Sequence, residues 1–132
     1  MRVLIDSTSW SLVLRRKQPN DPVASVLASL IQDHRVAIIG PIRQEVLSGI
    51  RESAHFEPLR DRLRGFSDTE ITSADYEEAA SFYNKCQRNG IQGSHTDFLI
   101  CAVAVRNGFA IFTTDGDFAQ YAKHLPITLY DS

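Results

Sequence analysis

The amino-acid sequence predicts an α/β domain with a central, mainly parallel sheet. Short apolar segments of strand length suit strands that are buried on both faces. Amphipathic segments of helix length separate them, which favours right-handed helical crossovers between neighbouring strands. The chain has 132 residues, the usual length of one domain, so we expect residues 1–132 to form a single domain.

The first half of the chain begins with an expected buried strand at residues 2–5. A short helix is expected over residues 8–14. Residues 18–22 predict a loop that ends in Asp-Pro, a pair suited to the N-cap and first position of the next helix. A second buried strand is expected at residues 36–39.

A Gly-Pro pair then opens a helix at residue 40, and an Arg-rich helix is expected at about residues 54–65. Residues 70–71 predict a brief edge strand. The segment at residues 72–75, Thr-Ser-Ala-Asp, has the form of a capping box and opens a long amphipathic helix.

The last third of the chain predicts a helix over residues 94–107, ended by a glycine. A strand at residues 109–112 and a turn at residues 113–117 follow it. We expect a short helix at residues 118–123 and a last strand at residues 126–130.

Composition excludes several classes of protein. The longest apolar run has eight residues, at positions 98–105, which is too short to cross a bilayer. Cys86 and Cys101 lie in apolar helical patterns and favour a reducing, cytoplasmic compartment. The net charge of −2 gives no sign of nucleic-acid binding, so any positive charge that binds RNA must be local.

Four acidic residues have informative positions. Asp6 and Asp115 each follow a buried strand, and ligands of open α/β sheets bind outside the carboxyl ends of the strands. Asp97 begins the apolar face of its helix, and Glu45 is expected near the packing face of another helix. Carboxylates that converge without a neighbouring basic residue repel one another, and a hard divalent cation relieves that repulsion.

Each acid also has a simpler interpretation. Asp6 could cap the helix that follows it, and Asp97 could complete a capping box. Glu45 could be an exposed residue near a helix N-terminus, while Asp115 and Asp117 could be turn residues. The joint pattern favours a shared site over four separate explanations.

Four segments of the chain resemble, in order and spacing, the motifs of the PIN domain: Leu4–Ser9, Pro41–Gly49, Asp97–Gly108 and Ile111–Phe118. Length and order are similar to those of VapC-type toxins of bacterial type II toxin–antitoxin pairs. The resemblance implies a three-layer α/β/α fold and an endoribonuclease that depends on Mg²⁺ or Mn²⁺. It also implies an RNA substrate, a VapB-type antitoxin partner and a homodimer.

The resemblance assigns the catalytic and metal-binding roles to Asp6, Glu45, Asp97 and Asp115, with Asp117 as an auxiliary acid. Thr8 stands where the family often has Ser or Asn, and its hydroxyl and that of Thr113 could orient carboxylates. Two basic groups are candidates for RNA contact, with an ordinary solvated surface as the alternative for each: Arg15, Arg16 and Lys17, and Arg60 and Arg64.

Other functions remain as alternatives. A receiver domain would carry a paired acid after the first strand and a lysine in a late strand, and a haloacid dehalogenase would carry a second Asp at position 8. Both patterns are missing from the sequence. A catalytically inactive PIN-like module that acts through a DNA-binding antitoxin is the alternative from another class, and the intact acids argue against it.

Overall fold

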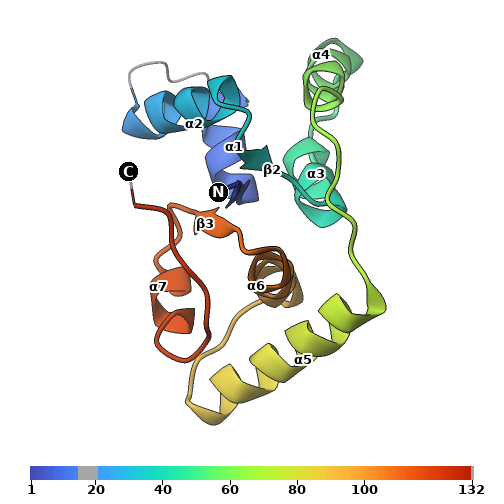
Figure 1. The fold of residues 1–132 in the computed structure, drawn as a ribbon. Helices are drawn as coiled ribbons and strands as arrows, with labels where there is room; N and C mark the ends of the chain where they lie inside the picture. Colours follow the sequence, from blue (N-terminus) through green and yellow to red (C-terminus); the bar gives the residue numbers. More distant parts are fainter. Residues whose placement is uncertain (15–20, 132) are drawn as a thin grey trace.

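The computed structural model describes residues 1–14 and 21–131, so Arg15, Arg16, Lys17 and the start of the expected loop at 18–22 lie outside the described residues. A parallel sheet forms the centre of the fold (Figure 1). Its strands are β1 (Val3–Ile5), β2 (Val36–Ala37) and β3 (Ala110–Phe112), in the order β2-β1-β3. Val3 pairs with Val36 on one side and with Ala110 on the other.

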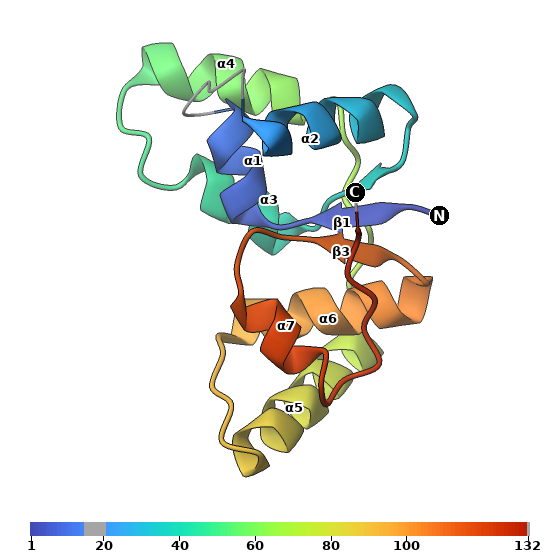
Figure 2. The ribbon, with the colours of Figure 1, turned by 90° about the vertical axis from the view of Figure 1, so that its left-hand side faces the viewer.

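Helices cover both faces of this sheet, which gives the predicted three layers (Figure 2). Helices α1 (Ser7–Leu14), α2 (Pro22–Gln32) and α4 (Ser53–Leu63) lie on one side. Helices α5 (Ser73–Arg88), α6 (His95–Asn107) and α7 (Asp117–Tyr121) lie on the other. Helix α3 (Gly40–Leu47) continues from β2 and packs against α1 and α4. The predicted α/β/α architecture with a parallel sheet is confirmed.

Three of the helix ends form where the sequence predicts them. The carboxylate of Asp21 accepts the Val23 N–H at 2.8 Å and caps α2. Thr72 and Asp75 form both hydrogen bonds of a capping box at the start of α5. Gly108 ends α6 with φ of 69°, a left-handed conformation that glycine adopts at little cost.

The expected edge strand at residues 70–71 and the expected last strand at residues 126–130 do not form as regular strands. Residues 70–71 form no strand; the neighbouring pairing is a single parallel bridge between Ile38 and Asp68. The Arg43 guanidinium fixes this segment because it donates to the carbonyl oxygens of Leu63 and Phe66 and pairs with Asp68 at 2.9 Å. The pairing therefore occurs upstream of the expected position.

The expected strand at residues 126–130 is likewise reduced to one parallel bridge, between Ile111 and Leu129. Two backbone hydrogen bonds of 2.8 Å flank it, from the Ile111 N–H to the Thr128 oxygen and from the Tyr130 N–H to the Ile111 oxygen. The segment thus adds an extended edge to β3 without forming a regular strand.

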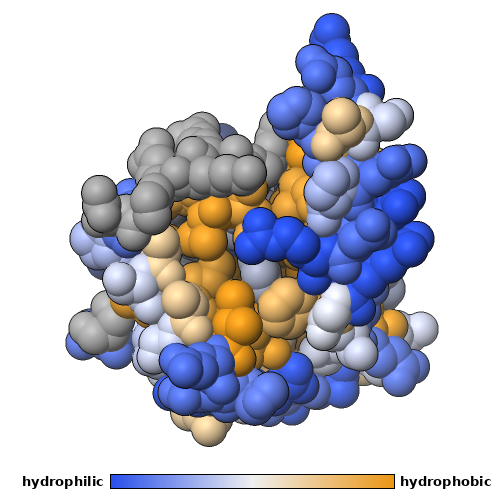
Figure 3. All heavy atoms as spheres, turned by 90° about the horizontal axis from the view of Figure 1, so that it is seen from above, coloured by the Kyte–Doolittle hydropathy of each residue, from blue (hydrophilic) through white to orange (hydrophobic). Residues whose placement is uncertain are grey.

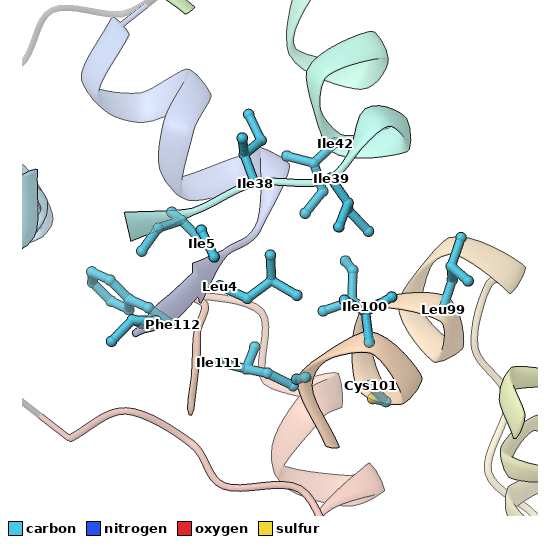
Figure 4. Packing of buried hydrophobic residues seen from close by; sticks show 14 of the residues in the cluster. Leu4, Ile5, Ile38, Ile39, Ile42, Leu99, Ile100, Cys101, Ile111 and Phe112 are labelled. Atoms are coloured by element: carbon cyan, nitrogen blue, oxygen red, sulfur yellow. The ribbon is translucent and has the colours of Figure 1, made fainter. Parts of the chain in front are cut away.

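The core lies between the sheet and α6. Every residue from Phe98 to Ala104 is buried, and Figure 4 shows Ile100 of α6 facing Leu4 and Ile111 of the sheet. Because α6 is packed so closely against β1 and β3, its first turn is held at the carboxyl edge of the sheet. No helix of the described part of the chain is both long and apolar enough to span a membrane.

Candidate metal centre

The carboxyl ends of β1 and β3 reach the same edge of the sheet, where α1 and α7 follow (Figure 2). Asp6 comes directly after β1, and Thr113 comes directly after β3. This parallel arrangement places the residues after both strands side by side, as the sequence pattern predicts for a ligand site.

Three carboxylates meet at this edge. Asp97 in the first turn of α6, Asp115 in the β3–α7 loop and Asp117 at the start of α7 each offer an oxygen atom, and these atoms lie within 4.8 Å of one another. We call these residues the acidic triad. Their proximity requires the packing of α6 against β3, since they are distant from one another in sequence except within the loop.

The loop that carries two of these acids is fixed by its own hydrogen bonds. The Asp117 N–H donates to Oδ1 of Asp115 at 2.9 Å, and the Asp115 N–H donates to Oγ1 of Thr113 at 2.9 Å. Asp115 and Asp117 are therefore turn residues as well as members of the acidic triad. The two interpretations of these residues are compatible.

Asp6 lies behind the acidic triad and is buried. Its Oδ1 accepts the Ser9 N–H at 2.9 Å, which caps α1. Its Oδ2 accepts a short hydrogen bond from the Thr113 hydroxyl. Thr113 thus links Asp6 to the backbone of Asp115, while Asp6 is not among the three carboxylates whose oxygens lie within 4.8 Å of one another.

Asp97 has a hydrogen-bond partner that sequence reasoning missed. The Tyr121 hydroxyl donates to Oδ2 of Asp97 at 2.6 Å, and the Asp97 N–H donates to Oγ of Ser94 at 3.1 Å. Burial, followed by the hydrogen bond to Asp97, raises the pKa of Tyr121 well above its usual value, so the phenol remains a neutral donor. The sequence does carry one signal for this residue, because Tyr121 follows Asp117 by about one helical turn.

Glu45 and Thr8 are not part of this arrangement. Helix α3 buries Ile42 and Val46, and Glu45 falls beside that face and is exposed. Glu45 thus lies near the packing face, and its exposure agrees with the simpler interpretation of an exposed helix residue. Thr8 is also exposed, and its side chain makes no hydrogen bond to an acid of the described residues.

The basic candidates that the structure describes are engaged by a nearby acid. Arg60 and Arg64 approach Asp61 at 3.1 Å and 3.7 Å on α4. His95 at the start of α6 is exposed and stacks on Tyr83 of α5, with ring centroids 5.2 Å apart.

The donor set of the acidic triad fits a hard divalent cation. All three candidate ligands are carboxylate oxygens, which Mg²⁺ and Mn²⁺ prefer. Within residues 1–14 and 21–131, no lysine or arginine forms a salt bridge with Asp97, Asp115 or Asp117. No ion pair within these residues therefore relieves the repulsion among the three carboxylates.

Comparison with known proteins gives concordant matches. The family model of the PIN domain matches residues 3–124. The chain is 30% identical over 126 residues to VapC ribonuclease Mb1587 of Mycobacterium bovis and to ribonuclease VapC11 of Mycobacterium tuberculosis, with 92% of each chain covered.

Similar folds occur in solved structures, among them the following two. FitAcB from Neisseria gonorrhoeae matches with a TM-score of 0.78 at 20% identity, covering 98% of this chain and 96% of that chain. VapBC2 from Rickettsia felis, bound to a DNA fragment from their promoter, matches with a TM-score of 0.76 at 14% identity, covering 100% of this chain and 99% of that chain.

Proposed function

This chain belongs to the PIN domain family, and on that premise we propose that it is a VapC-type toxin that hydrolyses RNA as an endoribonuclease. The observation that carries the proposal is the acidic triad, which lies at the ligand-binding edge of the sheet. The similarity to VapC ribonucleases over nearly the whole chain supports RNA as the substrate.

We assign the direct metal ligands to Asp97, Asp115 and Asp117, and Asp6 remains a candidate ligand beside them. When bound, Mg²⁺ or Mn²⁺ supplies Lewis-acid stabilisation of the developing phosphate charge and activates water for attack. Asp6 holds Thr113, and Thr113 holds the loop of Asp115, so these two residues keep the triad in place. Glu45 remains a candidate for contact through water from the exposed face of α3.

Binding of RNA requires positive charge near this edge. We keep Arg60 and Arg64 as candidates because both side chains are partly exposed beside Asp61. Arg15, Arg16 and Lys17 remain candidates from the sequence alone. The free, buried thiols of Cys86 and Cys101 fit the reducing cytoplasm that the sequence predicts.

We further propose a VapB-type antitoxin as the partner. Figure 3 shows apolar side chains gathered in a hollow beside the hydrophilic surface of α4. A cavity of 640 Å³ on this side is lined by apolar and by charged or polar residues, among them Leu14, Ile50 and Leu59, and Arg51, Glu52, His55 and Arg62. Glu52 lies 3.5 Å from His55, so the two arginines are left to meet an amphipathic segment that carries acidic residues beside its apolar face.

The predicted homodimer also remains a proposal. Tyr76 of α5 and Val105 of α6 are large apolar side chains that are exposed, and we place the contact between two copies on these helices. Light scattering of the purified chain at about 50 µM, a concentration at which a micromolar dimer is populated, should give twice the monomer mass. A monomer mass would refute the dimer.

Cleavage of RNA by the purified chain tests the proposed function. We expect internal cleavage of a single-stranded RNA in Mn²⁺ or Mg²⁺ and none in EDTA. Asp115→Asn, which keeps an oxygen for the Asp117 N–H, should lose at least about 100-fold in rate. Asp33→Asn, at an exposed acid at the end of α2, is the matched control and should retain full activity.

Full cleavage in EDTA would refute the metal-dependent mechanism. A chain that cleaves no RNA in either metal but still binds an antitoxin would support the inactive module instead.

A further inference from the structure

The buried hydroxyl of Tyr121 has one described acceptor, and that acceptor belongs to the acidic triad. The hydroxyl lies 2.6 Å from Oδ2 of Asp97. The tyrosine ring is 0% exposed and packs between Phe98 and Phe118, with centroid distances of 4.9 Å and 5.1 Å. Packing from both sides leaves the ring little freedom, so the position of its hydroxyl is fixed.

The space occupied by this hydroxyl accounts for a glycine in the loop before α6. A Cβ atom at Gly93 would lie 2.2 Å from Oη and 2.8 Å from Cζ of Tyr121. Gly93 is not among the residues of positive φ, so its backbone would accept an alanine. Gly93 is therefore required for space: it lets the loop pass directly over the tyrosine hydroxyl.

Asp97 needs such a partner because two like charges lie within 4.8 Å of it. Its side chain is only partly buried, and repulsion favours rotation of the carboxylate toward solvent. A phenol donates a hydrogen bond without bringing a positive charge. It can hold the carboxylate in place and leave its charge available to a cation, whereas a lysine or arginine would compete with that cation.

We propose that Tyr121 is a positioning residue for the metal centre, and that Gly93 provides the space it needs. Tyr121 acts through Asp97: it holds this carboxylate beside Asp115 and Asp117 so that the three can bind a divalent cation together. This inference rests on the proposed function, because it assigns the acidic triad to metal binding.

Mn²⁺ binding, followed by electron paramagnetic resonance of the free ion, tests the proposal without relying on catalysis. Tyr121→Phe keeps the ring and removes the hydroxyl, and we expect it to weaken Mn²⁺ binding about 10-fold, the lower range for loss of an outer-shell partner. Tyr83→Phe is the matched control, since Tyr83 also packs on Phe98 but donates to no acid of the described residues. Its Mn²⁺ affinity should equal that of the parent.

Kinetics separate positioning from a general loss of structure. If Tyr121 acts on metal binding, RNA cleavage by Tyr121→Phe should need about 10-fold more Mn²⁺ for half-maximal rate, and kcat should return toward the parent value at saturating Mn²⁺. A lower melting temperature in EDTA with unchanged Mn²⁺ affinity would show a merely structural role and overturn the proposal.

Gly93→Ala gives an independent test through the same hydroxyl. The added Cβ must displace the tyrosine, so Mn²⁺ binding should weaken in this variant as well. In the Tyr121→Phe background the clash with Oη and the hydrogen bond are both gone, and only the contacts with Cζ at 2.8 Å and with Phe98 Cε2 at 3.0 Å remain, so the same substitution should weaken Mn²⁺ binding by less than it does in the parent. Fully additive effects would contradict the proposed link.

Asp97→Asn separates this inference from the proposed function. If the parent binds Mn²⁺ and Asp97→Asn abolishes that binding while Tyr121→Phe leaves it unchanged, only the positioning role is refuted. If Asp97→Asn binds Mn²⁺ as tightly as the parent, both the metal centre and the positioning role are refuted.

Discussion

Replacing Asp97 with Asn should stabilise the metal-free protein. The substitution removes one negative charge, and its amide oxygen can still accept the Tyr121 hydroxyl. At 4.8 Å each like-charged pair costs about 1 kcal/mol at the dielectric constant of water and about 3.5 kcal/mol at an effective value of 20. Exposure of the triad favours the lower value, so relief of two pairs is worth about 2 kcal/mol.

The loss of a favourable interaction with the N-terminus of α6 opposes this stabilisation but is smaller. Asp97 lies in the first turn of α6, where a negative charge stabilises the helix by about 0.3–1 kcal/mol, and Asn loses that interaction. We therefore expect a net gain of about 1 kcal/mol in the free energy of unfolding in EDTA. For a chain of this length, that gain corresponds to a rise of about 4 °C in Tm.

Bound metal should make the parent more stable than Asp97→Asn, the reverse of the order in EDTA. At a concentration about 100 times its Kd, a cation that binds only the folded state stabilises the parent by about 2.7 kcal/mol, or about 10 °C in Tm. Asp97→Asn should lose most of this shift. Thermal unfolding of both proteins in EDTA and in millimolar Mn²⁺ measures both effects. A variant that is less stable in EDTA and keeps the full metal shift would show that Asp97 is only a structural residue.

Three further predictions concern stability. Burial alone would raise the pKa of Asp75, but hydrogen bonds from Arg106 and Thr72 outweigh it and lower the pKa. The stabilisation from Asp75 is thus present above about pH 4 and is lost as the pH falls through the lowered pKa of the folded state. Urea unfolding at several pH values should show this loss of unfolding free energy in the parent and not in Asp75→Asn. The buried Ser9 hydroxyl has no hydrogen-bond partner among the described residues, so Ser9→Ala should leave the free energy of unfolding unchanged or raise it by about 1 kcal/mol. Chemical denaturation measures this change, and a loss of more than about 1 kcal/mol would contradict the prediction. Gly108→Ala should cost about 1 kcal/mol because φ at this position is 69°, and an unchanged Tm would refute that reason.

The parts of the fold that the sequence predicts well are those set by local chemistry. Thr72 and Asp75 satisfy each other's backbone groups whatever surrounds them, and Gly108 ends its helix through its own conformational freedom. The edge pairing at residue 68 depends instead on the distant side chain of Arg43, which no local pattern reveals.

The difference between local and long-range determinants also decides how well the sequence predicts the candidate site. Asp6 and Asp115 follow buried parallel strands, and this topology alone predicts that they approach the same edge of the sheet. The apolar pattern of α3 places Glu45 beside the buried Ile42 and Val46, but its exposure depends on how far the neighbouring elements cover the helix, which the sequence does not show. Tyr121 was missed because its ring belongs to the core, while only its hydroxyl reaches the acids.

Anomalous diffraction from crystals soaked in Mn²⁺ locates the cation itself and so decides whether the acidic triad is the metal centre. We expect one strong peak within coordination distance of Asp97, Asp115 and Asp117, at about 2.0–2.3 Å from their oxygens, which disappears in Asp115→Asn crystals. A peak elsewhere on the molecule with none at the acidic triad would refute this metal centre.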